Sequence, residues 1–153
     1  MSQSRVDLIF SMMRHREYVK EGMHLIKAEL ERRALVHDLS KYKEDEYNGF
    51  AKLNSVARNF AYGSPEYIES MKAGKEVIDL HFSRNSHHPE YNNYNMGWLD
   101  IIEMVVDWRA AWKGYESGLT WEETVAKQRE RFQDKLGGNQ WWLVEEIAKW
   151  VEK

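Results

Sequence analysis

The side chains of this sequence best suited to chemistry are its six histidines. His37 is followed directly by Asp38, and three more histidines cluster further along the chain, namely His81, His87 and His88. A single His-Asp dipeptide indicates little by itself. Imidazole and carboxylate groups that converge from separate helices, however, can hold a divalent metal ion and activate water. The elements that carry these groups therefore decide what they can do.

Residues 5–34 have the apolar spacing of one long helix. The apolar positions recur at steps of three and four residues and predict one face, made of Leu8, Met12, His15, Val19, Met23 and Ile26. His24 falls on the opposite, charged face. The pattern predicts that His15 points inward and His24 outward. A lone histidine on an apolar face is also commonly a hydrogen-bonded core residue, so His15 alone does not identify a site.

The rest of the chain also has helical periodicity, and no stretch alternates long enough to predict a sheet. Ser64 before Pro65 is typical of a helix start, and Thr120 with Glu123 is typical of a capping box. The expected elements are a helical turn over 35–41, a helix over 44–59, a break at 61–63, a helix from 65 to 82 or 84, a polar loop over 85–95, helices over 98–112 and 121–136, a turn at 137–138 and a last helix to 153.

The helix expected over 98–112 carries a narrow acidic line among hydrophobic residues. Asp100, Glu103 and Asp107 follow one another at three- and four-residue spacing. This line either faces water or places a buried carboxylate beside a cation, because burying an unpaired charge is very costly. Joined with the histidines, it offers the mixture of ligands that Mn²⁺, Fe²⁺, Co²⁺ or Zn²⁺ accepts.

Composition sets the class of protein. The chain has 153 residues, 42% of them hydrophobic and 31% charged, which fits one globular domain over 1–153 with 119–153 as a helical extension packed on it. With a net charge of −3, the chain lacks the excess of basic residues that binding to duplex nucleic acid requires. The chain has no cysteine, which excludes thiolate catalysis and Cys-ligated metals and fits a cytoplasmic protein. No stretch predicts a membrane span or a signal peptide.

The order of the site residues resembles the HD-domain superfamily of metal-dependent phosphohydrolases, whose pattern is H…HD…H…H…D. The stretches RHREYV, HDLSKY, HFSRNSHHPEY and EMVVDW look more closely like a small HD-like family of phage and bacterial proteins. The resemblance covers roughly Met12 to Trp112. It implies an all-α, HD-like helical bundle, which we expect to contain about six to seven helices.

The resemblance also implies the ligands of one or two divalent ions. The residues that match the first metal site are His15, His37, Asp38 and Asp107. Asp38 would bridge to a second ion held by His81 and by either His87 or His88. Two such ions sit about 3.5–4 Å apart and clamp the attacking and leaving oxygens of a phosphoryl displacement.

Three further residues are candidates for contacting the substrate. Lys41 follows Asp38 by three residues and matches the lysine of the HDxxK subset, where it would neutralise charge on a phosphoryl oxygen. The alternative for Lys41 is a solvated cation at a helix end. Arg84 and Asn85 stand beside the histidine cluster and are candidate phosphate or sugar contacts, although an arginine in an exposed loop is common.

The function implied is a phosphohydrolase that uses a metal-activated water, with Asp38 and Lys41 in catalytic roles. Its substrate would be a small phosphorylated molecule, a nucleotide or related metabolite. Two alternatives remain open from the sequence, an HD-type di-iron oxygenase and a non-catalytic nucleotide-binding module. The aromatic C-terminal helix, with Trp141, Trp142 and Trp150, packs either on its own domain or on a second subunit of a homodimer.

Overall fold

The computed structural model describes residues 3–60, 64–114 and 118–152, and these residues form helices and turns without a strand. The protein is therefore all-α, as the periodicity predicts. The chain divides into two compact units, Met1–His37 and Asp38–Lys153. A single domain over residues 1–153 stays a prediction. None of the described helices is both long and apolar enough to cross a membrane.

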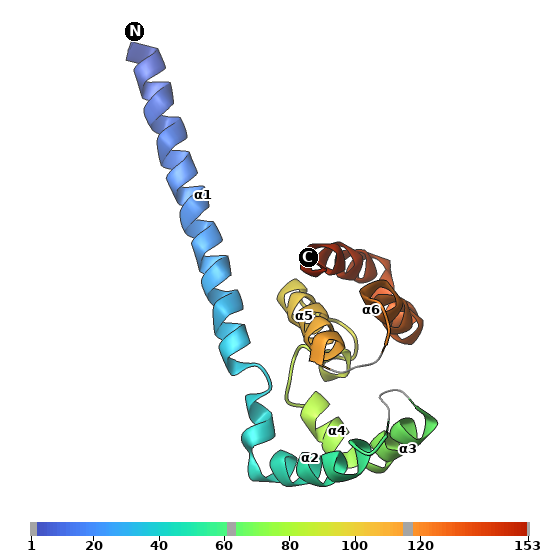
Figure 1. Cartoon of the computed structure of the whole chain (residues 1–153). Helices are drawn as coiled ribbons and strands as arrows, with labels where there is room; N and C mark the ends of the chain where they lie inside the picture. Colours follow the sequence, from blue (N-terminus) through green and yellow to red (C-terminus); the bar gives the residue numbers. More distant parts are fainter. Residues whose placement is uncertain (1–2, 61–63, 115–117, 153) are drawn as a thin grey trace. The chain divides into compact units, whose positions relative to one another are not determined.

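The first unit is one long helix, α1 (Gln3–Val36), seen in blue in Figure 1. Its 34 residues correspond to about 51 Å at 1.5 Å per residue. Acidic and basic residues pair along its surface, as between Lys27 and Glu31 at 3.5 Å. The helix expected over residues 5–34 is confirmed. Within the described part of this unit no second element packs on the stripe that carries His15.

The second unit begins with the short 3₁₀ helix η1 (Leu39–Tyr42) and three helices, α2 (Glu44–Ala57), α3 (Pro65–Ala73) and α4 (Lys75–Phe82). Ser64 caps α3, since its side chain accepts a hydrogen bond from the Tyr67 N–H at 3.1 Å. This start confirms the prediction from Ser64 and Pro65. The break expected at 61–63 lies outside the described residues.

The single helix expected from residue 65 to about 82 is wrong, because the chain breaks it at Gly74 into α3 and α4. The backbone of Gly74 leaves the helical conformation, with a φ of −91° and a ψ of 10°, at a point where α2 approaches closely. A Cβ atom on Gly74 would come within 2.7 Å of the Leu53 methyl groups. Gly49 of α2 is equally tight against Val77 of α4, at 2.6 Å. Glycine at these two positions lets α2 pack on the α3–α4 pair.

The main core lies between α5 (Trp98–Gly114) and α6 (Trp121–Val151), which run beside each other in Figure 1. A loop containing the 3₁₀ helix η2 (Pro89–Asn92) leads from α4 into α5. The most deeply buried side chains of this core are Ile101, Met104, Val105, Phe132 and Val144. Fully burying such a side chain contributes about 1.5–3 kcal/mol. This core fixes α5, which carries the acidic line.

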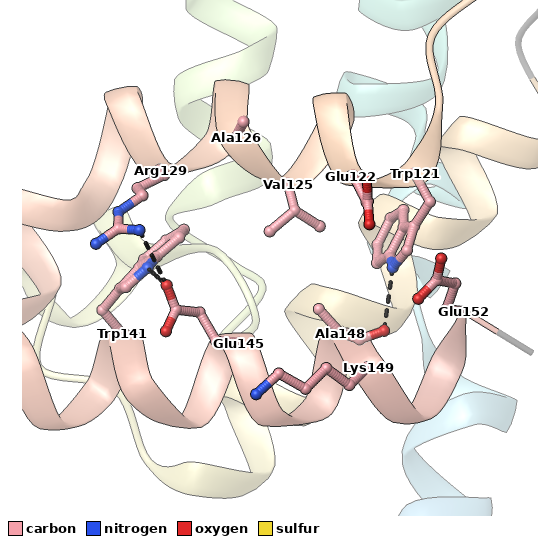
Figure 2. Close-up of a pocket in the computed structure, with 10 residues that line it drawn as sticks. All are labelled: Trp121, Glu122, Val125, Ala126, Arg129, Trp141, Glu145, Ala148, Lys149 and Glu152. Carbon is pink, nitrogen blue, oxygen red and sulfur yellow. Dashed lines mark hydrogen bonds and ion pairs between the residues drawn. The ribbon is translucent and has the colours of Figure 1, made fainter.

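The helix α6 folds back on itself at Gly137, whose φ of 72° and ψ of 159° are not helical. The expected turn at 137–138 is therefore confirmed, and so is the capping box of Thr120 and Glu123. Figure 2 shows the two halves side by side. Trp121 Nε1 donates to the Ala148 carbonyl at 3.0 Å, and Arg129 pairs with Glu145 at 3.2 Å.

Candidate metal centre

Four side chains of the second unit converge on one point. Each of them offers one ligand atom that lies within 4.8 Å of the other three. The four residues are Asp38, His81, His87 and His88. They come from the start of η1, the end of α4 and the following loop. The structure thus brings together the residues that the sequence assigns to the bridging ligand and the second ion.

Asp38 directs one carboxylate oxygen into this cluster. Its Oδ1 lies 3.1 Å from His81 Nε2 and 3.4 Å from His87 Nε2. The backbone of Asp38 is left-handed, with a φ of 57° and a ψ of 14°. Among residues with a Cβ, aspartate and asparagine adopt this conformation most readily. The left-handed turn allows η1 to start immediately after Asp38.

His81 is oriented by a buried carboxylate. Its Nδ1 lies 2.8 Å from Oε2 of Glu46, which is 0% exposed. Because a carboxylate can only accept, Nδ1 donates to Glu46, and in the neutral form of the ring this leaves the lone pair on Nε2. That Nε2 is buried and has no hydrogen bond within the described residues. A carboxylate behind a histidine is the usual partner of a metal-ligating imidazole.

Glu46 is in turn held by two other groups. Arg84 Nη1 donates to its Oε1 at 2.9 Å, and Ser40 Oγ donates to its Oε2 at 2.8 Å. Burial raises the pKa of Glu46, but the hydrogen bonds from Arg84, His81 and Ser40 outweigh it and the net pKa is lowered. Glu46 is therefore an anion in the interior, and its charge is shared with a cation and an imidazole.

Arg84 and Asn85 lie behind the cluster. Arg84 forms a two-pronged pair with Asp45, at 2.9 and 2.6 Å, besides its bond to Glu46. These carboxylates raise the pKa of Arg84, and the guanidinium holds the pKa of Asp45 well below its usual range. Asn85 donates to Ser40 Oγ and to the His81 carbonyl, each at 2.8 Å. These contacts make both residues supports of His81, while their contact with a substrate stays a prediction.

His87 has a carboxylate partner as well, supplied by α5. Its Nδ1 lies 3.2 Å from Oε1 of Glu103, and the residue is 3% exposed. This contact favours the tautomer in which Nε2 faces Asp38 as a potential ligand. Asp107, one helical turn after Glu103, also offers an oxygen within 4.8 Å of a His87 ring nitrogen. Glu103 and Asp107 of the acidic line thus lie beside His87, whereas Asp100 accepts hydrogen bonds from Ser86 Oγ and the Gly97 N–H.

His88 completes the set from the neighbouring position. Its ring lies 4.2 Å from the His87 ring and 4.9 Å from the His81 ring, centroid to centroid. Burial lowers the pKa of His88 to about 2, helped by the neighbouring His87 and His81. His88 is therefore neutral, which is the form that binds metal. Its Nε2 is buried without a hydrogen bond to any described residue.

Lys41 is the cation nearest to the cluster. Its Nζ lies 2.5 Å from Asp38 Oδ2 and 5.3 Å from the centre of the Phe50 ring. The two oxygens of Asp38 therefore face different groups, Oδ1 the imidazoles and Oδ2 the ammonium. The Lys41 side chain is 41% exposed, so it can also reach a ligand in solvent.

The remaining two expected ligands belong to the first unit. His15 lies on α1, and His37 is the last residue of that unit. His37 is bonded directly to Asp38, which keeps its backbone next to the cluster. The roles of both residues as ligands stay predictions.

The residues present fit a divalent metal ion. Three imidazoles and a carboxylate, with two of the imidazoles backed by acids, form a donor set suited to Zn²⁺, Fe²⁺, Co²⁺ or Mn²⁺. The buried Nε2 of His88, which has no hydrogen-bond partner among the described residues, supports this fit, because buried polar atoms normally have partners. Glu46 is the participant that the sequence did not reveal. It stands in an acidic first helical turn, which is common at any helix start.

The chain belongs to DUF5662, a family of unknown function, whose sequence profile matches residues 5–153. The match includes the whole cluster and the α6 hairpin. Comparisons with curated proteins and with solved structures gave no match.

Proposed function

We propose that the protein is a metal-dependent phosphohydrolase that cleaves a phosphate ester or anhydride of a small nucleotide or related metabolite. The observation that supports this function most is the convergence of Asp38 with His81, His87 and His88 within 4.8 Å. Such a group of buried imidazoles around one carboxylate has little structural purpose without a metal ion.

The four members of the cluster would hold one ion, the one that the resemblance gives as the second. Asp107 is near enough to His87 to take part, and the resemblance to the HD superfamily adds His37 and His15. This larger set has enough ligands for two ions that share Asp38. A bound divalent ion supplies an activated water near neutral pH and neutralises charge on the phosphoryl oxygens.

The chain's own residues have complementary tasks in this reaction. Glu46 and Glu103 hold the protons on the Nδ1 atoms of His81 and His87, so that both Nε2 atoms face the centre. Lys41 places a positive charge at the rim of the cluster, 2.5 Å from Asp38. A phosphoryl oxygen that replaces part of this contact would be stabilised as its charge grows in the transition state.

A phosphate-release screen tests the proposal. The full-length protein is incubated with Mn²⁺, Co²⁺, Fe²⁺ or Zn²⁺ and a panel of nucleotides, with His88→Ala as the inactive variant and His24→Ala as the matched control. We expect metal-dependent release of phosphate by the wild type and His24→Ala and none by His88→Ala. Oxygen consumption with Fe²⁺ and a diol or phosphonate, without phosphate release, would instead identify an oxygenase. Unchanged nucleotide under every metal would contradict hydrolysis.

A further inference from the structure

A cavity of about 570 Å³ lies in the second unit beside the metal cluster. Its wall includes His88 and Asp107 on one side and the first half of α6 on the other. The volume falls within the range of small-molecule sites, about 300–1,000 Å³. The residues that α6 contributes lie outside the motifs that carry the HD resemblance.

Aromatic rings form much of the cavity wall. They are Tyr67, Phe82, Trp108, Trp112 and Phe132. Trp108 and Trp112 are one turn apart on α5 and so lie on one face of the helix. Trp108 stacks on Phe132, with ring centres 5.9 Å apart and planes 6° from parallel. Flat walls of this kind favour a planar ring over a flexible chain, because stacking needs two flat surfaces.

The polar groups of the wall are suited to the edge of such a ring. Gln128 Oε1 and Glu90 Oε2 are buried acceptors that have no hydrogen bond within the described residues. A ring N–H or an exocyclic amino group could satisfy them after a small side-chain rotation. Purines and pyrimidines combine flat faces with such donors, whereas a lipid chain or a plain sugar does not.

The charged groups of the wall are two cations from α6 and two acids, Glu90 and Asp107. Lys127 and Arg131, one turn apart on α6, both line the cavity. Glu90 forms an ion pair with one of these two cations, since its Oε1 lies 3.3 Å from Arg131 Nη2. The Arg131 guanidinium also lies 4.4 Å from the centre of the Phe132 ring, which keeps it close to the aromatic wall. A base attached to a phosphate would therefore find matching partners here.

We infer that this cavity binds the nucleobase of the substrate, held against its aromatic wall and hydrogen-bonded at its edge by Gln128. The orientation rests on the proposed function, because His88 and Asp107 then place the phosphoryl group at the metal cluster. Binding of the base itself does not require metal or turnover. It can therefore be measured separately from hydrolysis.

Calorimetric titration of the metal-free, full-length protein with nucleosides tests the inference, with ribose and a short alkyl phosphate as comparison ligands. We expect a nucleoside to bind while ribose and the alkyl phosphate do not. Trp108→Leu should weaken nucleoside binding about tenfold or more, and Trp108→Phe should restore most of it. Gln128→Leu should weaken binding by about threefold to tenfold. Trp150→Ala is the matched control, because Trp150 is 71% exposed and lies outside the cavity.

The outcomes separate this inference from the proposed function. Nucleoside binding that Gln128→Leu weakens supports the cavity even if no phosphate is ever released. Phosphate release by a protein that binds no nucleoside would contradict nucleobase binding in the cavity but would still support the proposed hydrolase function. Equal binding by wild type and Gln128→Leu would contradict nucleobase binding in the cavity too. If Trp108→Leu fails to fold, the Gln128 variant still decides the question.

Discussion

Glu46 is completely buried and its Oε2 lies 2.8 Å from Nδ1 of His81. The opposite nitrogen of the same ring lies 3.1 Å from Asp38 Oδ1. His81 thus lies between two acids. Glu46 accepts from its Nδ1, and Asp38 lies beside Nε2, the nitrogen that would bind the metal. Arg84 and Ser40 fix Glu46 in turn. This line of contacts explains how the buried imidazole is held with its Nε2 directed at the cluster.

Replacing Glu46 tests this relationship. Glu46→Gln keeps the shape of the side chain but removes the charge that holds the Nδ1 proton, so we expect metal affinity to fall about 10- to 100-fold. Titration with Co²⁺ or Zn²⁺ measures the change. Glu44→Gln, at an exposed position of the same helical turn, is the control and should bind metal normally. Equal affinity in wild type and Glu46→Gln would contradict the role of Glu46.

Asp38 is both a candidate metal ligand and a residue with a left-handed backbone, and two substitutions separate these two properties. Asparagine also tolerates the left-handed conformation, so Asp38→Asn should fold normally and lose metal. Asp38→Ala should lose metal and also be less stable by roughly 1–2 kcal/mol, because alanine disfavours this backbone. Urea unfolding of the metal-free variants measures the difference. If both variants unfold at the same urea concentration, the backbone of Asp38 is not a constraint on the residue type.

Lys41 is expected to act on the substrate and not on the metal. Lys41→Met retains most of the aliphatic stem near Phe50 but removes the charge. We expect turnover to fall by about 10²–10³-fold, the cost of losing one transition-state contact to an anion. Metal content should stay near normal, as measured by elemental analysis, and Lys43→Met is the exposed control. Loss of metal from Lys41→Met would mean that Lys41 supports the structure of Asp38.

The neutral state of His88 predicts how stability depends on pH. Its pKa is lowered from 6.5 to about 2 in the folded protein. Below pH 6.5 the unfolded chain therefore takes up a proton that the folded chain does not, and stability is lost as the pH falls. The slope contributed by this group approaches about 1.4 kcal/mol per pH unit.

Unfolding of the metal-free protein by urea between about pH 7 and pH 5 measures this slope. The pKa of Glu46 is also lowered, but this reduces the free energy of unfolding only at pH values below its ordinary pKa of 4.5, which lie outside this range. His88→Gln should flatten the dependence by about one proton. A variant with the same slope as the wild type would show that His88 takes up protons equally in the folded and unfolded states.

Gly74 provides a test of the packing between α2 and the α3–α4 pair. Gly74→Ala would place a Cβ within 2.7 Å of Leu53, so we expect a loss of about 1–3 kcal/mol of unfolding free energy. Gly22→Ala is the control, because no atom lies within 4 Å of its added Cβ in α1. Chemical unfolding of both variants measures the difference. Equal stability would mean that α2 can shift at no cost.

Much of the fold could be predicted from local signals in the sequence. The capping box at Thr120 and the Ser64–Pro65 start are confirmed because such caps depend on neighbouring residues alone. The break at Gly74 could not be predicted in this way. A glycine inside a helical pattern is often tolerated, and the close approach of Leu53 to Gly74 joins residues that are distant in the sequence.

The candidate site was predictable in part for a similar reason. The types and order of Asp38, His81 and the His87–His88 pair suggested a metal centre, and the structure brings these four residues together. The supports of the imidazoles were less visible. Glu46 stands 35 residues before His81, and only the packing of α2 against α4 makes them neighbours. Sequence spacing carries no signal for such a pair.

Elemental analysis of the purified protein after metal loading and dialysis tests the central claim most directly. The wild type and His24→Ala should each retain at least one equivalent of Mn²⁺, Fe²⁺, Co²⁺ or Zn²⁺ per chain. Asp38→Asn and His88→Ala should retain almost none while keeping the helical circular dichroism of the wild type. A wild type that releases every ion on dialysis, or folded variants that retain as much metal as it does, would contradict the account.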